Sequence, residues 1–274
     1  MRRNRAALVI STLCAALTSC VPGPEPVITT PPKVTAEELL GEMDAYARRL
    51  ESASGVVTLT ARTPDGVLPA TEHGLAFARP DSVYVESLGP MGEIAVVTRV
   101  TGGRMAVHYV ADGVWAEGAA SPGNVERLVG VPLDLDLLIR ALLAEPLVRG
   151  EGFDGTVRYV RQENEGDPTR LALRREDGTR ALLMTVDPAA PVPLEQVLYD
   201  SDDAPALRIV YSDYAETDGL LRPYRILLEN YADSSVEISF SSQEVNPALP
   251  GNLFDLTPPA GVRVVELDKS AKPE

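Results

Sequence analysis

An alternation of apolar and polar residues with a period of two runs through most of this 274-residue chain. Successive side chains of a strand point to opposite faces of a sheet, so this pattern predicts antiparallel strands with one buried face. Asp-Gly pairs, which tolerate positive φ and favour tight hairpins, separate many of the runs. They occur at Asp65-Gly66, Asp112-Gly113, Asp154-Gly155, Asp177-Gly178 and Asp218-Gly219. The clearest predicted hairpin joins residues 171–176 to residues 179–186, and the chain is expected to be mainly β.

Two helical segments are expected beside the strands. Thr35 can cap a first helix, whose apolar residues recur at helical spacing and which Gly55 is expected to end. Asp134 can cap a second helix, with an apolar face made by Leu135, Leu138, Ile139 and Leu142, and Pro146 is expected to end it. The second helix interrupts the strands and is therefore a helical insert.

These elements predict a mainly β, α+β domain built on one curved antiparallel sheet of roughly ten strands. An open sheet of that size tends to curl, so we expect an open half-barrel. The N-terminal helix and the helical insert are expected to cover its mouth. Small β-barrels of this kind can hold one apolar ligand.

The N-terminus has the pattern of an export signal. Arg2, Arg3 and Arg5 precede an apolar run at residues 6–17, which is too short to span a bilayer as a helix. The run ends in Leu-Thr-Ser followed by Cys20, which resembles the lipobox of bacterial lipoproteins. The resemblance implies cleavage before Cys20 and acylation of this residue. The alternative is an ordinary secretory signal in which Cys20 stands by chance.

This interpretation divides the chain into four parts. Residues 1–19 are the signal peptide, and residues 20–34 are the acylated cysteine with a Pro-rich, extended tether. Residues 35–268 form a single domain, and residues 269–274 form a flexible tail. Val21, rather than Asp, follows the cysteine. The lipobox resemblance therefore implies an outer-membrane protein that is anchored by lipid and faces the periplasm.

Charge and cysteine content limit the partners. The chain has a formal charge of −15, and removal of three Arg with residues 1–19 makes it −18. Such a surface repels nucleic acid and anionic lipid headgroups, so membrane contact must come from the acyl anchor and local apolar groups. Cys14 lies in the signal and Cys20 would be acylated, so the mature domain is expected to have no free thiol. We therefore expect no disulfide, no cysteine–metal site and no thiol nucleophile.

Two segments resemble LolB, the outer-membrane lipoprotein receptor. Residues 81–97 read DSVYVESLGPMGEIAVV, a strand that enters a Pro-apolar-Gly turn and a second strand that leaves it. Residues 128–133 read LVGVPL and precede the helix expected at residues 135–143. The tail at residues 254–261 resembles the closing strand of LolA-like periplasmic carriers, and the match spans residues 35–267. The resemblance implies lipid or lipoprotein cargo and a periplasmic carrier or envelope protein as partner.

The resemblance also implies a membrane-contact site. In the family the apolar turn carries a protruding Leu, whereas this chain has Met91. Met91 is then expected to touch the bilayer together with Leu88 while cargo acyl chains move across. The alternative is a turn whose Met91 side chain folds back into the core. Residues 149–190 contain more strand than the family usually has there, which is a departure from its pattern.

Aromatic residues on the strand-like runs are candidates for the lining of a lipid cavity. They are Tyr84, Tyr109, Trp115, Tyr159 and Tyr211. The alternative is that they fill the core, as aromatic residues of strands often do.

The sequence argues against an enzyme. It contains two histidines, His73 in an expected loop and His108 in an expected strand, and no Gly-x-Ser-x-Gly elbow. Zinc requires three or four ligands, so no metal site is expected. No phosphate loop or dinucleotide fingerprint occurs, so no cofactor is expected.

Two functions remain open. The first is a lipoprotein of the outer membrane that binds lipid or lipoprotein acyl chains in an apolar half-barrel cavity, in lipoprotein localisation or envelope biogenesis. The second is a structural or assembly lipoprotein that serves as a protein-binding platform in an envelope complex.

Overall fold

The computed structural model describes residues 35–89, 91–129, 134–147, 169–187 and 189–267. The contacts divide the chain into residues 1–31 and residues 32–274, and all described residues lie in the second unit, to which the following refers. The signal peptide, Cys20, the tether and Tyr159 lie outside the described residues. So does the Asp154-Gly155 pair.

Three helices and fourteen strands are described. The helices are α1 (Ala36–Ala47), α2 (Pro122–Val129) and α3 (Leu135–Leu143). The first strands are β1 (Ser52–Thr63), β2 (Gly66–Val67), β3 (Thr71–Ala78), β4 (Ser82–Leu88), β5 (Ile94–Thr101), β6 (Arg104–Tyr109) and β7 (Val114–Ala119). The others are β8 (Thr169–Arg174), β9 (Arg180–Val186), β10 (Pro193–Tyr199), β11 (Pro205–Thr217), β12 (Leu220–Asn230), β13 (Ser235–Val245) and β14 (Arg263–Glu266).

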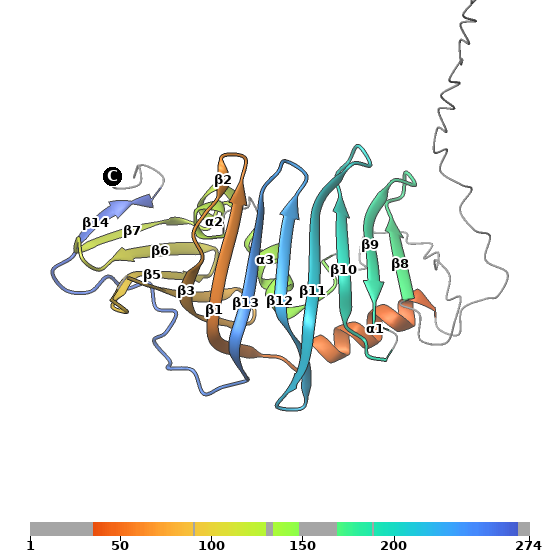
Figure 1. The fold of residues 1–274 in the computed structure, drawn as a ribbon, viewed down its shortest axis with the longest axis horizontal. Helices are drawn as coiled ribbons and strands as arrows, with labels where there is room; N and C mark the ends of the chain where they lie inside the picture. Colours follow the sequence, from red (N-terminus) through yellow and green to blue (C-terminus); the bar gives the residue numbers. More distant parts are fainter. Residues whose placement is uncertain (1–34, 90, 130–133, 148–168, 188, 268–274) are drawn as a thin grey trace, which may run out of the picture. The chain divides into compact units, whose positions relative to one another are not determined.

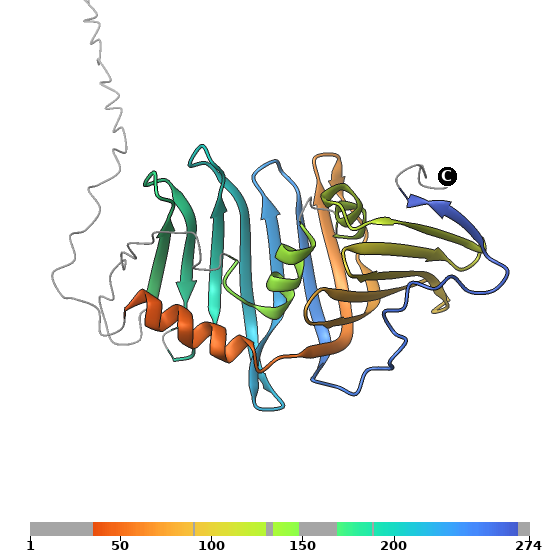
Figure 2. The same ribbon diagram turned by 180° about the vertical axis from the view of Figure 1, so that it is seen from behind.

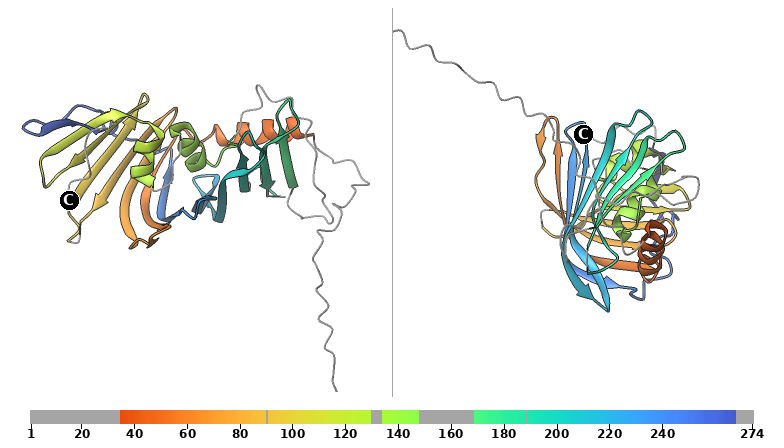
Figure 3. Two further views of the ribbon diagram at one scale, coloured as in Figure 1. Left: turned by 90° about the horizontal axis from the view of Figure 1, so that it is seen from above. Right: turned by 90° about the vertical axis from the view of Figure 1, so that its right-hand side faces the viewer.

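The strands form one curved, unclosed sheet, in the order β14-β7-β6-β5-β4-β3-β1-β13-β12-β11-β10-β9-β8, with β2 paired to β1 (Figures 1 and 3). Most neighbours in this order are consecutive antiparallel hairpins. The exception at the centre is β1, which pairs antiparallel with β13 and so joins the two ends of the chain. The predicted curved, mainly β sheet is therefore confirmed, with more strands than the roughly ten expected.

Local turn chemistry explains many of these hairpins. The β6–β7, β8–β9 and β11–β12 connections each contain an Asp-Gly pair, and Asp65 and Gly66 stand where the chain turns from β1 into β2; the glycine has positive φ in all four. The hairpin predicted from residues 171–186 is confirmed as β8 and β9, and Gly178 in its turn has φ +86°. These turns act through adjacent residues alone, so the sequence is sufficient to find them.

Three details of the sequence interpretation are wrong. Gly55 ends no helix but lies inside β1 opposite Gln243, where a Cβ would approach the Ser242 carbonyl oxygen to 2.1 Å. His73 lies in β3 rather than in a loop. Strand β14 pairs parallel with β7, not antiparallel, and its connection from β13 contacts the sheet through the bond from Arg99 Nε to the Leu253 carbonyl, 3.1 Å.

The two expected helices are present. Thr35 and Glu38 form a capping box at α1, because the Glu38 N–H donates to Thr35 Oγ1 (3.1 Å) and the Thr35 N–H donates to Glu38 Oε2 (2.7 Å). Asp134 is the N-cap of α3 by its backbone angles, although its side chain makes no capping bond. The helix ends at Leu143, before Pro146, and Ala144 takes the left-handed conformation.

The helices α1 and α3 lie on the same face of the sheet (Figure 2), which we call the inner face. The cross-strand pairs assign alternate residues to this face, and they are nearly all apolar. Val57, Phe77, Val83, Val100 and Met105 form the half that includes β1 to β6. Leu182, Met184, Ile209, Ile226 and Leu228 belong to the same cluster in the other half. Leu138, Ile139 and Leu142 of α3 join both halves in one core.

Candidate functional site

A buried arginine attaches α3 to the sheet. Arg222 occupies an inner-face position of β12, in line with Leu220, Ile226 and Leu228. Its guanidinium donates from Nη1 to the Leu143 carbonyl (3.0 Å) and from Nη2 to the Leu142 carbonyl (2.6 Å). A cation at the C-terminal end of a helix is favoured by the helix dipole. Burial lowers the pKa of Arg222 to about 10, so it stays charged at neutral pH.

A buried glutamine holds the segment that follows α3. Gln196 of β10 is fully buried, with 0% of its surface exposed. It accepts a bond from the Leu147 N–H (2.9 Å) and donates to the Glu145 carbonyl (2.7 Å). Gln196 Nε2 also lies 3.3 Å from the hydroxyl of Tyr211, whose pKa is raised by burial. Residues 145–147 are thus tied to the sheet by side-chain bonds.

Glu145 links three elements through its carboxylate. It forms an ion pair with Arg79, and its second oxygen lies 4.0 Å from Arg140 Nη1. Arg79 also donates to the Leu50 carbonyl (2.7 Å) and the Ala47 carbonyl (2.9 Å), at the end of α1. We call Arg79, Glu145, Gln196 and Arg222 the polar latch. The polar latch connects α1 and α3 to the sheet through hydrogen bonds and ion pairs of buried or part-buried side chains.

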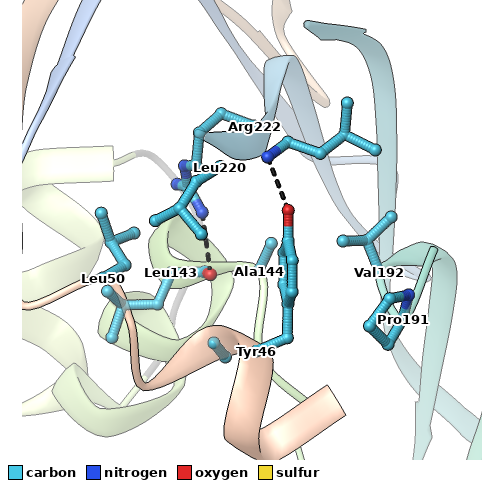
Figure 4. A pocket seen from close by; sticks show the side chains of 10 residues that line it. Tyr46, Leu50, Leu143, Ala144, Pro191, Val192, Leu220 and Arg222 are labelled. Atoms are coloured by element: carbon cyan, nitrogen blue, oxygen red, sulfur yellow. Dashed lines mark hydrogen bonds between the residues drawn. The ribbon is translucent and has the colours of Figure 1, made fainter. Parts of the chain in front are cut away.

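A pocket lies between α1, the end of α3 and β12 (Figure 4). Tyr46, Leu50, Leu143, Val192 and Leu220 contribute to its wall, and the Leu221 N–H donates to the Tyr46 hydroxyl (2.6 Å). The volume left free is about 10 Å³. This is room for about one water molecule, so the pocket is filled by its own side chains.

The β4–β5 turn projects its apolar residues outward. Met91 is 92% exposed and Leu88 is 37% exposed. The alternative in which Met91 folds back into the core does not describe this turn. The predicted contact of these two residues with a membrane stays a prediction.

The aromatic candidates fall on two different faces. Tyr211 lies in the inner-face core and Tyr109 packs against it. Trp115 and Tyr84 flank Arg99, whose guanidinium lies 5.8 Å and 5.2 Å from their ring centroids. Because Tyr84 pairs with Arg99 between Val83 and Val85, this group occupies the face opposite the helices, the outer face. Tyr109 and Tyr211 therefore remain the candidates for lining an inner-face site.

The two histidines occupy different environments in the described part of the chain. His73 lies between the hydroxyls of Thr71 (2.7 Å) and Ser87 (3.0 Å), and burial lowers its pKa. His108 is on the outer face, with its ring centroid 6.0 Å from that of Trp115. Among the described residues, no group of three or more His, Cys, Asp or Glu side chains could hold a metal ion. None of the helices in the described ranges is long and apolar enough to cross a membrane.

The sequence interpretation missed the polar latch. The sequence does contain a sign of two of these residues. Arg222 and Gln196 are polar, yet they occupy positions of β12 and β10 at which the alternating pattern otherwise places apolar, inward-facing residues. Such residues need partners when they are buried. The partners, however, are backbone carbonyls on α3 and after it, which no pattern within β10 or β12 reveals.

Comparison with known proteins identifies solved structures with a similar fold. No protein-family model matches the chain. A LolA superfamily protein from Nitrosomonas europaea is 18% identical, with a TM-score of 0.52 over 81% of this chain and 97% of that one. A DUF1329 family protein from Desulfovibrio piger is 14% identical, with a TM-score of 0.56 over 79% of this chain and 94% of that one.

A curated relative supports the same assignment. The outer-membrane lipoprotein carrier protein of Albidiferax ferrireducens is 35% identical over an alignment of 83 residues, and the match covers 25% of this chain. The matched part spans 38% of that relative's length. The resemblance to LolA- and LolB-like proteins expected from the sequence is therefore confirmed at the level of the fold.

Proposed function

We propose that this chain is an exported, lipid-anchored protein that binds the acyl chains of lipids or lipoproteins on the inner face of its sheet. It would act at the periplasmic side of the outer membrane, in lipoprotein localisation or envelope biogenesis. The observation that carries the proposal is a largely apolar inner face against which α3 is held by a small set of polar contacts. The carrier named above and the LolA-like fold support a binding role rather than catalysis.

Acyl-chain binding at the end of α3 requires this helix to move. The free volume of about 10 Å³ beside it is far smaller than an acyl chain. Leu138, Ile139 and Leu142 of α3 are each 2% exposed. Exposing three such side chains costs about 5–9 kcal/mol. An acyl chain that buries a dozen CH₂ groups in their place contributes about 10 kcal/mol, enough to offset this cost.

The polar latch sets how easily α3 leaves. Opening separates Arg222 from two helix carbonyls and Gln196 from residues 145–147. In the proposed closed state these bonds exclude cargo and water. A helical cover over the inner face and an anchor at Cys20 complete the proposal, and both were expected from the sequence. The anchor would keep the domain within reach of one membrane surface.

Binding of a fluorescent fatty acyl probe tests the proposal. The protein is expected to bind the probe saturably, and lipid extracted from the purified protein is expected in a mass spectrum. The variant Arg222→Met should bind the probe more tightly, because a weaker closed state lowers the cost of opening. Arg208→Met, a substitution on the outer face of neighbouring β11, should leave the affinity unchanged. Absence of both probe binding and extracted lipid would refute the function.

The anchor has its own test. Intact mass of the membrane-extracted protein should show an N-terminus at Cys20 with added acyl groups, and Cys20→Ser should release the protein from membranes. A mature protein with an unmodified Cys20 would refute the anchoring.

The second candidate, an assembly platform without cargo, is favoured by one observation. The pocket at the end of α3 is filled by protein side chains, as in a domain that binds nothing there. A protein partner recovered in stoichiometric amount from membranes, together with failure to bind the probe, would support this function instead.

A further inference from the structure

A histidine and two hydroxyl groups form a polar cluster on the largely apolar inner face. His73 is 8% exposed and alternates along β3 with Leu75 and Phe77 of the inner-face core. Its Nε2 atom lies 2.7 Å from Thr71 Oγ1, and its Nδ1 atom lies 3.0 Å from Ser87 Oγ. Thr71 is exposed and Ser87 is half-buried, so the cluster reaches the surface where β3 begins. We call Thr71, His73 and Ser87 the hydroxyl–imidazole cluster.

This cluster has an unused hydrogen-bond donor. A neutral imidazole has one N–H donor and one acceptor nitrogen, so one of the two hydroxyls donates to the ring and the other accepts from it. The hydroxyl that accepts keeps its own hydrogen free. Among the described residues, neither Thr71 Oγ1 nor Ser87 Oγ makes a further hydrogen bond. One O–H group is therefore available to a ligand, whichever ring nitrogen is protonated.

Protonation of His73 increases the number of free donors to two. Both ring nitrogens then donate, both hydroxyls accept from them, and both O–H hydrogens are left for a ligand. Two donors next to a positive charge match the two oxygens of a carboxylate. The carbonyl of an ester can use one of these donors, but it carries no charge that would stabilise the imidazolium.

The inner-face neighbours of His73 are uncharged. Val57 of β1 and Ser87 of β4 lie opposite His73, and Val96 and Tyr109 continue this row on β5 and β6. Val96 and Tyr109 are partly buried and pack against the core. An acyl chain whose head lies at Ser87 would therefore meet Val96 and Tyr109 next.

The carboxylates nearest to the cluster in the sequence face away from it. Glu72 precedes His73 and Glu86 precedes Ser87, so the alternation of the strands places both glutamates on the outer face. The acidic residue of α2, Glu126, is exposed. No ion pair among the described residues involves His73, and burial lowers its pKa. A bound carboxylate would supply the missing counter-charge and raise this pKa.

We propose that the hydroxyl–imidazole cluster binds the carboxylate head of a fatty acid, whose acyl chain lies on the inner face along Val96 and Tyr109. A fatty acid is one form of the acyl cargo of the proposed function, on which this inference rests. Binding takes up a proton at neutral pH, since His73 is neutral in the free protein and charged in the complex. The cluster thereby distinguishes a free acid from an acyl chain in ester linkage.

Calorimetric titration with dodecanoate and with its methyl ester tests this specificity. The full chain carries Cys20→Ser, so that its own acyl groups cannot occupy the site. At pH 7 the acid should bind about tenfold more tightly than the ester, because a hydrogen bond to a charged group is the stronger one. This preference should decrease as the pH is raised and His73 stays neutral in the complex.

Two variants remove the proposed donors one at a time. Thr71→Val keeps the shape of an exposed side chain, and Ser87→Ala removes the second hydroxyl. Each should weaken binding of the acid by about threefold to tenfold and change binding of the ester less. The matched control is Ser82→Ala, which removes a hydroxyl from a residue of β4 that is 8% exposed and bonds Thr101 on the outer face. This control should bind the acid as the parent does.

The protonation of His73 gives a readout that does not depend on affinity. The chain contains two histidines, so His108→Gln leaves one imidazole to follow by NMR. The pKa of His73 should lie below its ordinary value of about 6.5 in the free protein. It should lie above this value when dodecanoate saturates the site, and the methyl ester should leave it unchanged.

Three results would overturn the inference. The ester could bind as tightly as the acid at pH 7. The variants Thr71→Val and Ser87→Ala could lose no more acid binding than Ser82→Ala, with thermal unfolding showing that all three are folded. The pKa of His73 could stay unchanged or fall when dodecanoate binds. Equal binding of both ligands refutes the carboxylate site alone, whereas failure to bind either ligand refutes the proposed function as well.

Discussion

Replacement of Arg222 by methionine tests whether the polar latch holds α3 to the sheet. Methionine keeps much of the length of the arginine side chain and removes its donors. The Leu142 and Leu143 carbonyls then lose their bonds of 2.6 Å and 3.0 Å. No other described residue donates to these two oxygens outside the helix. Both carbonyls would be left unsatisfied in a buried place.

The magnitude follows from these two groups. A buried acceptor without a partner costs about 1–3 kcal/mol, so two cost about 2–6 kcal/mol. The loss of stability is reduced because the variant no longer buries a charge. Burial of the charge is unfavourable, as the lowered pKa of Arg222 indicates. We therefore expect the free energy of unfolding to fall by about 2–4 kcal/mol.

Denaturant unfolding followed by the fluorescence of Trp115, the single tryptophan, measures this loss. The matched control is Arg208→Met on the outer face of β11, where Arg208 pairs with Glu195 at 2.6 Å and Glu229 at 2.5 Å. Part-exposed ion pairs contribute little, so the control should lose no more than about 1 kcal/mol. If Arg222→Met loses no more than this control, the latch does not hold α3 and the reasoning is wrong.

Two further predictions concern the sheet. Gly55→Ala should destabilise the protein by about 2–3 kcal/mol, because the new Cβ would collide with the Ser242 carbonyl. Gly41→Ala in α1 adds a Cβ that has no atom within 4 Å, so it should stabilise the protein by about 0.5–1 kcal/mol. Equal melting temperatures of the two variants would contradict this. Burial lowers the pKa of His73 in the folded protein below the value of about 6.5 that it has in the unfolded chain. As the pH falls toward 6, the unfolded chain therefore binds more protons than the folded protein does. The free energy of unfolding should therefore decrease as the pH is lowered from 7 to 6, by at most about 1.4 kcal/mol per pH unit. His73→Gln should remove this contribution to the pH dependence. An unchanged pH dependence in the variant would show that other groups cause it.

Features set by adjacent residues could be predicted from the sequence. The Asp-Gly turns, the Thr35 cap and the alternation in β12 each depend on a few neighbouring positions. Gly55 was misassigned because glycine ends helices and also permits close approach of two backbones. Its actual role depends on Ser242, almost 190 residues away in the chain.

The candidate site was less predictable for the same reason. Alternation shows that Val83 and Tyr84 face opposite sides of β4, but it does not show which side bears the helices. Tyr84 and Trp115 were therefore grouped with Tyr109 and Tyr211, although they flank Arg99 on the outer face. The role of Arg222 requires the position of α3, which is fixed by packing rather than by local pattern.

The pairing of β1 with β13 has a consequence for how the chain reaches its folded state. Strands β1 to β7 form successive hairpins, as do β8 to β13, but the seam between these halves joins residues 53–62 to residues 235–245. Contacts of such large sequence separation form late and slowly, because a long loop must close first. Until the seam closes, β1 and β13 each present an open edge. Open strand edges can pair with other chains, so aggregation is expected to compete with folding until this seam forms.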